Sequence, residues 1–172
     1  MFLRFYEDPF LLDVANNYFK GRMTNAYTLA SNIEYKDGNI GSGQGWHRDS
    51  NQMQFKAMIY LSDVDIKDGP FQMIQGSHRF KEIIQDGNIM DTKPLSTRFI
   101  HKQVSKLIDY QPDRYKVFTA KAGTLIFIDS SAIHTGMPLS KGGRRYSLFN
   151  YYYPSYDDIK TRRSLMEKDI RN

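Results

Sequence analysis

The most informative stretch of this sequence is Gly123-Thr124-Leu125-Ile126-Phe127-Ile128-Asp129-Ser130-Ser131-Ala132-Ile133-His134-Thr135-Gly136. An apolar run at residues 124–128 predicts a buried strand, and a turn of small polar residues follows it. His134 comes directly after this turn, near the end of a strand. In a β barrel or sandwich, that is a suitable place for a metal ligand at the mouth.

The rest of the chain contains more short strands than helices. Strands are predicted at residues 26–35, 45–49, 55–61, 71–74, 116–119 and 144–153, with turn signals at Asp37-Gly38 and Asp68-Gly69-Pro70. Such a pattern favours a mainly β sandwich or barrel. One amphipathic helix is predicted over residues 9–19, because Asp8-Pro9 is a typical helix start and Gly21 a plausible stop.

No repeat or low-complexity linker divides the 172 residues, so we expect a single domain over residues 1–172. Residues 80–110 look helical or irregular and interrupt the strands. An insertion of this length is more often functional than idle, so we expect it to be a lid over the barrel mouth. Residues 155–172 are predicted to be a charged, solvated tail.

The composition narrows the possible functions. The chain has no cysteine, which excludes disulfides and thiolate metal sites and fits a reducing compartment. No apolar run is long enough to span a membrane, and the first residues do not resemble a signal peptide, so we expect a cytoplasmic protein. The net charge of +5 suits a small, anionic substrate. The basic residues are scattered among acidic ones, so nucleic acid is not an expected partner.

The triplet His47-Arg48-Asp49 is a candidate for metal binding. Residues i and i+2 of a strand point to the same face, so the imidazole and the carboxylate could reach one ion. A second histidine, His134, would complete a set of two histidines and one carboxylate, which is the known ligand set of non-heme Fe(II) oxygenases. The triplet alone is a weak signal, since a histidine hydrogen-bonded to a nearby carboxylate is an ordinary structural pair.

Arg145 is the second unusual residue, because it opens an otherwise apolar and aromatic strand at residues 145–153. A buried arginine needs an anionic partner, and a carboxylate bound in bidentate fashion would provide one. Ser147 shares a face with Arg145 and could add a hydroxyl donor. Arg144 is expected to be an exposed neighbour.

Taken together, these motifs resemble the phytanoyl-CoA dioxygenase family over roughly residues 9–154. The resemblance rests on the order and spacing of Trp46-His47-Arg48-Asp49, Tyr60-Leu61-Ser62-Asp63-Val64, Gly69-Pro70-Phe71, Gly76-Ser77-His78, Gly123-Thr124, Asp129, His134 and Arg145. It implies a double-stranded β-helix (a cupin-like jelly roll) with a few flanking helices, and a dioxygenase that uses Fe(II), 2-oxoglutarate and O2. His47, Asp49 and His134 would be the metal ligands, and Arg145 would bind the distal carboxylate of 2-oxoglutarate.

The resemblance implies hydroxylation of a small organic molecule, with release of succinate and CO2. Some family members are halogenases with a small residue in place of the carboxylate ligand, so Asp49 favours hydroxylation here. Two alternatives stay open at this point: a cupin-like metalloenzyme that does not use 2-oxoglutarate, and a non-catalytic binding module on the same scaffold. The other two histidines, His78 and His101, are not expected to bind metal.

Overall fold

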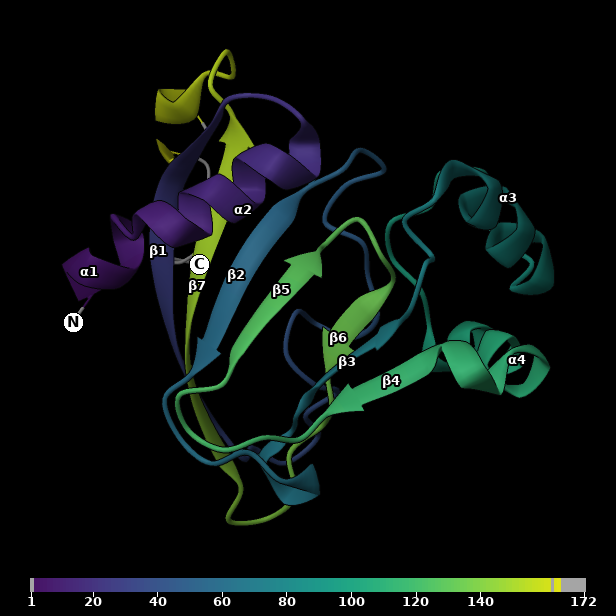
Figure 1. Cartoon of the computed structure of the whole chain (residues 1–172). Coiled ribbons are helices and arrows are strands. Elements are labelled where there is room, and N and C mark those ends of the chain that lie inside the picture. The colour runs from purple at the N-terminus through teal and green to yellow at the C-terminus, as the bar shows by residue number, and fades with distance from the viewer. Residues whose placement is uncertain (1, 162, 165–172) are drawn as a thin grey trace.

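Two antiparallel sheets form the centre of the molecule (Figure 1). They are seen in a computed structural model that describes residues 2–161, 163 and 164. The larger sheet has the strand order β1 (Met23–Glu34), β7 (Arg144–Pro154), β2 (Phe55–Tyr60) and β5 (Leu125–Asp129). The smaller sheet has the order β4 (Tyr115–Phe118), β3 (Phe71–Ile74) and β6 (His134–Gly136).

The apolar side chains of the two sheets meet in a shared core. The larger sheet contributes Met58, Tyr60, Ile126 and Ile128 to it, and Phe71 of β3 comes from the smaller sheet. Alternation along β2 explains this arrangement, because Met58 and Tyr60 point inward while Phe55 and Ala57 point to the opposite face. The two packed antiparallel sheets confirm the predicted mainly β fold, a double-stranded β-helix.

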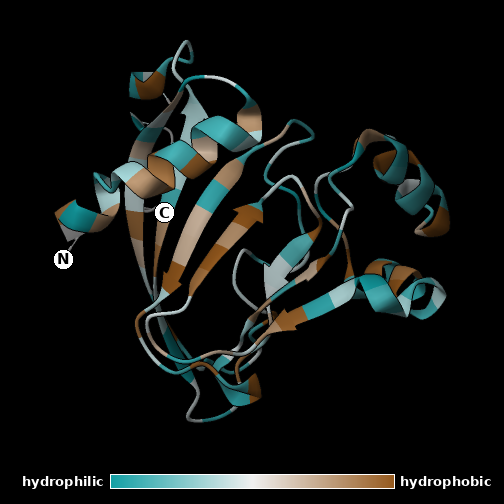
Figure 2. Cartoon of the chain, in the orientation of Figure 1, coloured by the Kyte–Doolittle hydropathy of each residue, from teal (hydrophilic) through white to brown (hydrophobic). Residues whose placement is uncertain are grey.

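The outer face of the larger sheet is covered by α1 (Phe2–Tyr6) and α2 (Pro9–Phe19) (Figures 1 and 2). The side chain of Asp8 accepts a hydrogen bond from the Leu11 amide and caps α2. Lys20 ends the helix in the left-handed conformation. Leu11 and Ala15 are buried against the sheet, so α2 closes one side of the sandwich.

Residues 80–110 contain α3 (Phe80–Ile89) and α4 (His101–Tyr110), which lie beside the smaller sheet (Figure 1). Short 3-10 helices, η1 (Ile66–Asp68) and η2 (Pro112–Arg114), complete the elements. Val104 and Leu107 of α4 are fully buried in a cluster that includes Trp46. The Phe99 amide donates to the Trp46 carbonyl (3.0 Å), so this region is joined to the segment that carries the His47 triplet.

The C-terminal segment lies partly within the described residues. Residues 159–161, 163 and 164 are helical, and Arg163 donates from Nε to the carbonyl of Ala26 (2.5 Å). The predicted charged tail also includes residues 162 and 165–172, which lie outside the described part of the chain. In the described residues, no helix is long and apolar enough to cross a membrane.

The packing of α4 gives a testable expectation for stability. Leu107→Ala should lower the free energy of unfolding by about 2–5 kcal/mol, because it removes a fully buried side chain and leaves a cavity. Tyr110→Ala on the same helix is the matched control, since Tyr110 is 69% exposed. Urea denaturation followed by circular dichroism measures both. Equal stability of the two variants would contradict this packing.

Candidate metal centre

His47 and His134 are joined through their backbones. The His47 amide donates to the His134 carbonyl (2.9 Å), and the His134 amide donates to the His47 carbonyl (2.8 Å). Residues that exchange both hydrogen bonds lie directly opposite each other on antiparallel strands, with their side chains on the same face. The two imidazole ring centres are accordingly 4.3 Å apart, although the residues are distant in sequence.

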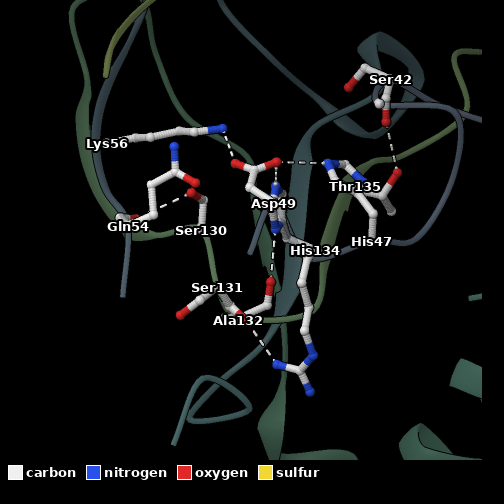
Figure 3. A network of polar contacts seen from close by, with 12 residues as sticks. Ser42, His47, Asp49, Gln54, Lys56, Ser130, Ser131, Ala132, His134 and Thr135 are labelled. Carbon is white, nitrogen blue, oxygen red and sulfur yellow. Dashed lines mark hydrogen bonds and ion pairs between the residues drawn. The ribbon is translucent and has the colours of Figure 1, made fainter. Parts of the chain in front are cut away.

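Asp49 completes a cluster with these two histidines (Figure 3). Its Oδ1 lies 3.4 Å from His47 Nε2 and 4.0 Å from His134 Nε2. The candidate ligand atoms of the three residues all lie within 4.8 Å of one another. The Asp49 amide donates to the Ser130 carbonyl (3.0 Å), which holds the carboxylate beside the end of β5. The expected same-face placement of His47 and Asp49 is therefore observed. Residues 45–49 do not form the predicted strand, because His47 alone makes isolated bridges there, one to Arg98 and one to His134.

The protonation of both imidazoles is determined by backbone carbonyls. Nδ1 of His47 lies 2.8 Å from the Gly45 carbonyl, and Nδ1 of His134 lies 2.8 Å from the Ala132 carbonyl. A carbonyl only accepts, so each Nδ1 carries the proton and each Nε2 presents its lone pair to the cluster. Burial lowers the pKa of His134 to about 3, since it disfavours the charged imidazolium. His134 is thus neutral near pH 7, as a metal ligand must be.

A lysine that the sequence interpretation missed belongs to the same cluster. Lys56 of β2 forms an ion pair with Asp49 Oδ2 (Figure 3), and its Nζ lies 4.2 Å from the ring centre of Tyr151. Burial by itself would raise the pKa of Asp49, but the positive charge of Lys56 is the largest opposing influence, and the pKa stays well below its ordinary value. A signal was available in the sequence: Lys56 is a charged residue within the apolar run at residues 55–61, as Arg145 is within its own strand.

The turn before His134 is built by short polar side chains. Oδ1 of Asp129 accepts from both the amide (2.9 Å) and the hydroxyl (2.6 Å) of Ser131. Ser77, from the Gly76-Ser77-His78 motif, accepts from the Ile133 amide through its hydroxyl (2.7 Å). The guanidinium of Arg48 donates to the Ser131 carbonyl (2.7 Å) and to the Ser77 carbonyl. These contacts fix the backbone on which His134 stands, and they explain the motif residues as structural.

Arg145 is buried beside the cluster without an acidic partner. Only 2% of its surface is exposed. Nη2 donates to the Ser42 hydroxyl (2.8 Å) and Nη1 to the Gly69 carbonyl, while Nε has no hydrogen-bond partner among the described residues. No described carboxylate lies within ion-pair distance of this guanidinium. Burial lowers its pKa, but an arginine remains charged at neutral pH.

A cavity of about 280 Å³ connects the cluster to Arg145. It is lined by His47, Asp49, Lys56, His134 and Arg145, together with apolar side chains that include Met58, Phe71, Ile128 and Phe149. Glycines make room for it, because a Cβ at Gly43 would overlap the His47 ring and one at Gly136 would overlap the Ser42 hydroxyl. At this size the cavity is near the lower limit of ligand pockets, which suits a small molecule.

Ser147 is buried next to Arg145 on β7, and its hydroxyl has no hydrogen-bond partner among the described residues. It does not line the 280 Å³ cavity, so its predicted role as a donor stays a prediction. Arg144 is exposed, as expected. His78 and His101 are not part of the described metal-binding cluster.

Residues 80–110 do not line the cavity in the described part of the chain. The Arg48 amide donates to the Thr97 carbonyl (2.8 Å), and Arg98 donates from Nη1 to the Gly43 carbonyl (2.6 Å). Through these two hydrogen bonds, the segment holds the backbone of the His47 triplet and of the nearby Gly43. Its role as a lid stays a prediction.

The chain is similar in structure to several solved proteins. HygX from Streptomyces hygroscopicus, solved with nickel and 2-oxoglutarate bound, is 16% identical with a TM-score of 0.61, covering 90% of this chain and 65% of that one. EctD from S. alaskensis, solved with 2-oxoglutarate and 5-hydroxyectoine, is 18% identical with a TM-score of 0.64, covering 88% and 51%. SnoN from nogalamycin biosynthesis, described as a non-heme alpha-ketoglutarate-dependent epimerase, is 17% identical with a TM-score of 0.64, covering 88% and 57%.

At these identities the likeness shows a common fold. The chain spans between 51% and 65% of the length of these three proteins. None of the curated proteins matches it in sequence. The family model for phytanoyl-CoA dioxygenase matches residues 7–146, a stretch that includes the cluster and Arg145. The chain therefore belongs to the phytanoyl-CoA dioxygenase family.

Proposed function

We propose that this protein is an Fe(II)- and 2-oxoglutarate-dependent dioxygenase that hydroxylates a small organic substrate. One observation carries the proposal: two imidazole lone pairs, a carboxylate and a buried guanidinium without an acidic partner open onto a single cavity. Membership of the phytanoyl-CoA dioxygenase family supports it. So does the fold shared with HygX and EctD, which were solved with 2-oxoglutarate bound.

The three cluster residues suit Fe(II). Two imidazoles and one carboxylate bind one face of the ion and leave the other coordination positions open. His47 and His134 present Nε2, and Asp49 presents Oδ1, from positions that the backbone pairing holds close together. Because both Nδ1 protons are bound to carbonyls, the backbone fixes the orientation of the two rings. No fourth histidine, aspartate or glutamate joins the cluster in the described residues, which speaks against the cupin-like alternative.

Arg145 suits the distal carboxylate of 2-oxoglutarate. Its Nη2 donates to the Ser42 hydroxyl, a neutral group that leaves the positive charge uncompensated. A bound carboxylate would supply the missing negative charge and form charge-assisted hydrogen bonds in a site with little water. One cavity joins Arg145 to the cluster, so bound 2-oxoglutarate could contact the metal at one end and the Arg145 guanidinium at the other.

With iron and 2-oxoglutarate bound, the site would activate O2 and oxidise a C–H bond of the substrate, with succinate and CO2 as coproducts. The protein's share is orientation, charge and exclusion of water. Met58, Phe71 and Phe149 line the cavity with apolar surface and limit the water near the reacting groups. Asp49 favours hydroxylation over halogenation, since it supplies the carboxylate that a halide would otherwise replace.

The activity is tested by incubating the protein with Fe(II), 2-oxoglutarate and O2 and measuring succinate. Succinate should form slowly without a substrate and faster when a substrate is added. Binding of Mn(II) without any binding of N-oxalylglycine, an unreactive analogue of 2-oxoglutarate, would favour a metalloenzyme that does not use this cosubstrate. Absence of both would favour a non-catalytic module.

The ligand assignment predicts a large loss of metal affinity on substitution. His134→Ala and Asp49→Ala should each weaken Mn(II) binding by at least about 100-fold, since each removes one of three ligands. Isothermal titration calorimetry measures this directly. His101→Ala, an exposed histidine on α4, is the control and should bind Mn(II) as the unmodified protein does. Retention of full affinity by Asp49→Ala would exclude the proposed triad.

The role of Arg145 predicts a separate effect. Arg145→Gln should weaken binding of N-oxalylglycine to the Mn(II)-loaded protein by about 10–100-fold, since charge-assisted hydrogen bonds are lost. Mn(II) affinity itself should change little. Arg144→Gln is the matched control, because Arg144 is the exposed neighbour on the same strand. The assignment would be wrong if both variants bound the analogue equally well.

A further inference from the structure

Lys56 is a buried cation that the proposed chemistry does not use. Its side chain is 8% exposed, and β2 points it inward beside Asp49. Fe(II) needs three ligands from the protein, and Arg145 suffices for the distal carboxylate of 2-oxoglutarate. Its partner, Asp49, is already needed as a metal ligand, so a second cation at this site calls for a purpose.

Lys56 stands at the boundary of two cavities. Asp49, Lys56 and Tyr151 line the 280 Å³ cavity and also a second cavity of about 680 Å³. We call the second cavity the tyrosine bowl; its lining includes Tyr27, Gln52, Gln54, Tyr153 and Tyr156. A molecule in the tyrosine bowl would face the cluster across these three shared side chains. The bowl is therefore a suitable place for the substrate, with the smaller cavity left to 2-oxoglutarate.

The charges of the loaded site leave a surplus. The two negative charges of 2-oxoglutarate balance the two positive charges of Fe(II), and both imidazoles are neutral when they bind metal. Lys56 and Arg145 are positive and Asp49 is negative, so one positive charge remains. When Asp49 binds Fe(II), its carboxylate is shared between the metal and Lys56. A substrate with one negative charge would neutralise this surplus.

The lining of the tyrosine bowl agrees with such a substrate. Lys56 is the only lysine or arginine among its described lining residues, and Asp157 is a further carboxylate there. The rings of Tyr27 and Tyr151 are stacked 4.6 Å apart, and Gln54 Nε2 donates to the Tyr153 hydroxyl (2.7 Å). Flat phenol faces and amide groups suit a ring-shaped molecule with polar substituents. An anionic group on that molecule would find its one cationic partner next to the metal.

We propose that Lys56 determines specificity by binding the carboxylate of a small substrate held in the tyrosine bowl. This inference rests on the proposed function, since it takes the cluster as the metal site and the smaller cavity as the 2-oxoglutarate site. It narrows the substrate class to small monoanions. It also places their charged end, rather than a neutral part, close to the reacting centre.

The test uses matched pairs of probes and the full chain loaded with Zn(II) and N-oxalylglycine. Benzoate, phenylacetate and phenoxyacetate are each compared with the corresponding neutral amide by ligand-observed NMR. At least one carboxylate should bind about 10-fold more tightly than its amide, and Lys56→Met should reduce this ratio to about 1. Lys102→Met, an exposed lysine of α4, should keep the preference. If no carboxylate is preferred by the unmodified protein, the inference is overturned.

A second readout separates substrate binding from mere positioning of Asp49. Metal affinity of Lys56→Met should be unchanged or higher, because a positive charge next to the divalent ion is removed. A 10-fold loss of metal affinity with an unchanged carboxylate-to-amide ratio would make Lys56 a positioning residue. A selective loss of N-oxalylglycine binding would assign Lys56 to the cosubstrate. Both results overturn the inference.

Lys56→Gln, which keeps a polar side chain, provides a second variant if Lys56→Met unfolds. The unmodified protein also distinguishes this inference from the proposed function. If it binds neither Zn(II) nor N-oxalylglycine, the proposed function itself fails. If it binds both without preferring any carboxylate, only the role of Lys56 fails.

Discussion

The reciprocal backbone hydrogen bonds between His47 and His134 are the constraint on which the candidate site depends. His47 lies outside any regular strand and is held by two isolated bridges, to His134 and to Arg98. The amides of Arg48 and Asp49 add bonds to Thr97 and Ser130, so three successive residues are anchored to different parts of the fold. These hydrogen bonds bring two imidazoles and a carboxylate together. Such preorganisation lowers the ordering cost that metal binding would otherwise carry.

Charged side chains line the cavity beside the hydrophobic core. The three hydrophobic clusters are built from apolar side chains, whereas the cavity beside them holds Asp49, Lys56 and Arg145. Replacing buried charges by apolar groups often stabilises a protein, so the buried Lys56 and Arg145 are better explained by ligand binding than by folding. Arg145 has no acidic partner, and Lys56 shares its one carboxylate, Asp49, with the metal-binding cluster. In both cases positive charge exceeds the negative charge beside it. Each is relieved by an anion that the protein itself does not supply.

Much of this architecture could be predicted because its physical causes are local. Alternating apolar residues predicted the strands, and β3 has the expected bounds of residues 71–74. The Asp8-Pro9 start predicted α2, which spans Pro9–Phe19. The three residues of β6 were not predicted as a strand, because so short an element is defined by its partner β3 rather than by its own pattern. The packing of α4 against Trp46 could not be predicted from local sequence patterns, since it depends on contacts between distant segments.

The site was predictable to the extent that spacing and charge are visible in a sequence. His47, Asp49, His134 and Arg145 were identified, and the structure brings all four to one cavity. Lys56 was overlooked because a single lysine in a strand is ordinarily exposed on an edge, and only the order β1-β7-β2-β5 shows that β2 is an interior strand. Tyr151 of β7 lines the cavity, whereas Phe55 of β2 points to the helix-covered face. Tyr151 pairs with Lys56 across the two strands, so Phe55 lies one residue out of register with Tyr151 and its side chain points to the opposite face of the sheet.

The most direct measurement is a crystal structure of the protein with Mn(II) and N-oxalylglycine. The account predicts one ion bound by Nε2 of His47, Oδ1 of Asp49 and Nε2 of His134, with the distal carboxylate of the analogue on the guanidinium of Arg145. An ion bound elsewhere, or a distal carboxylate on any group other than Arg145, would contradict it.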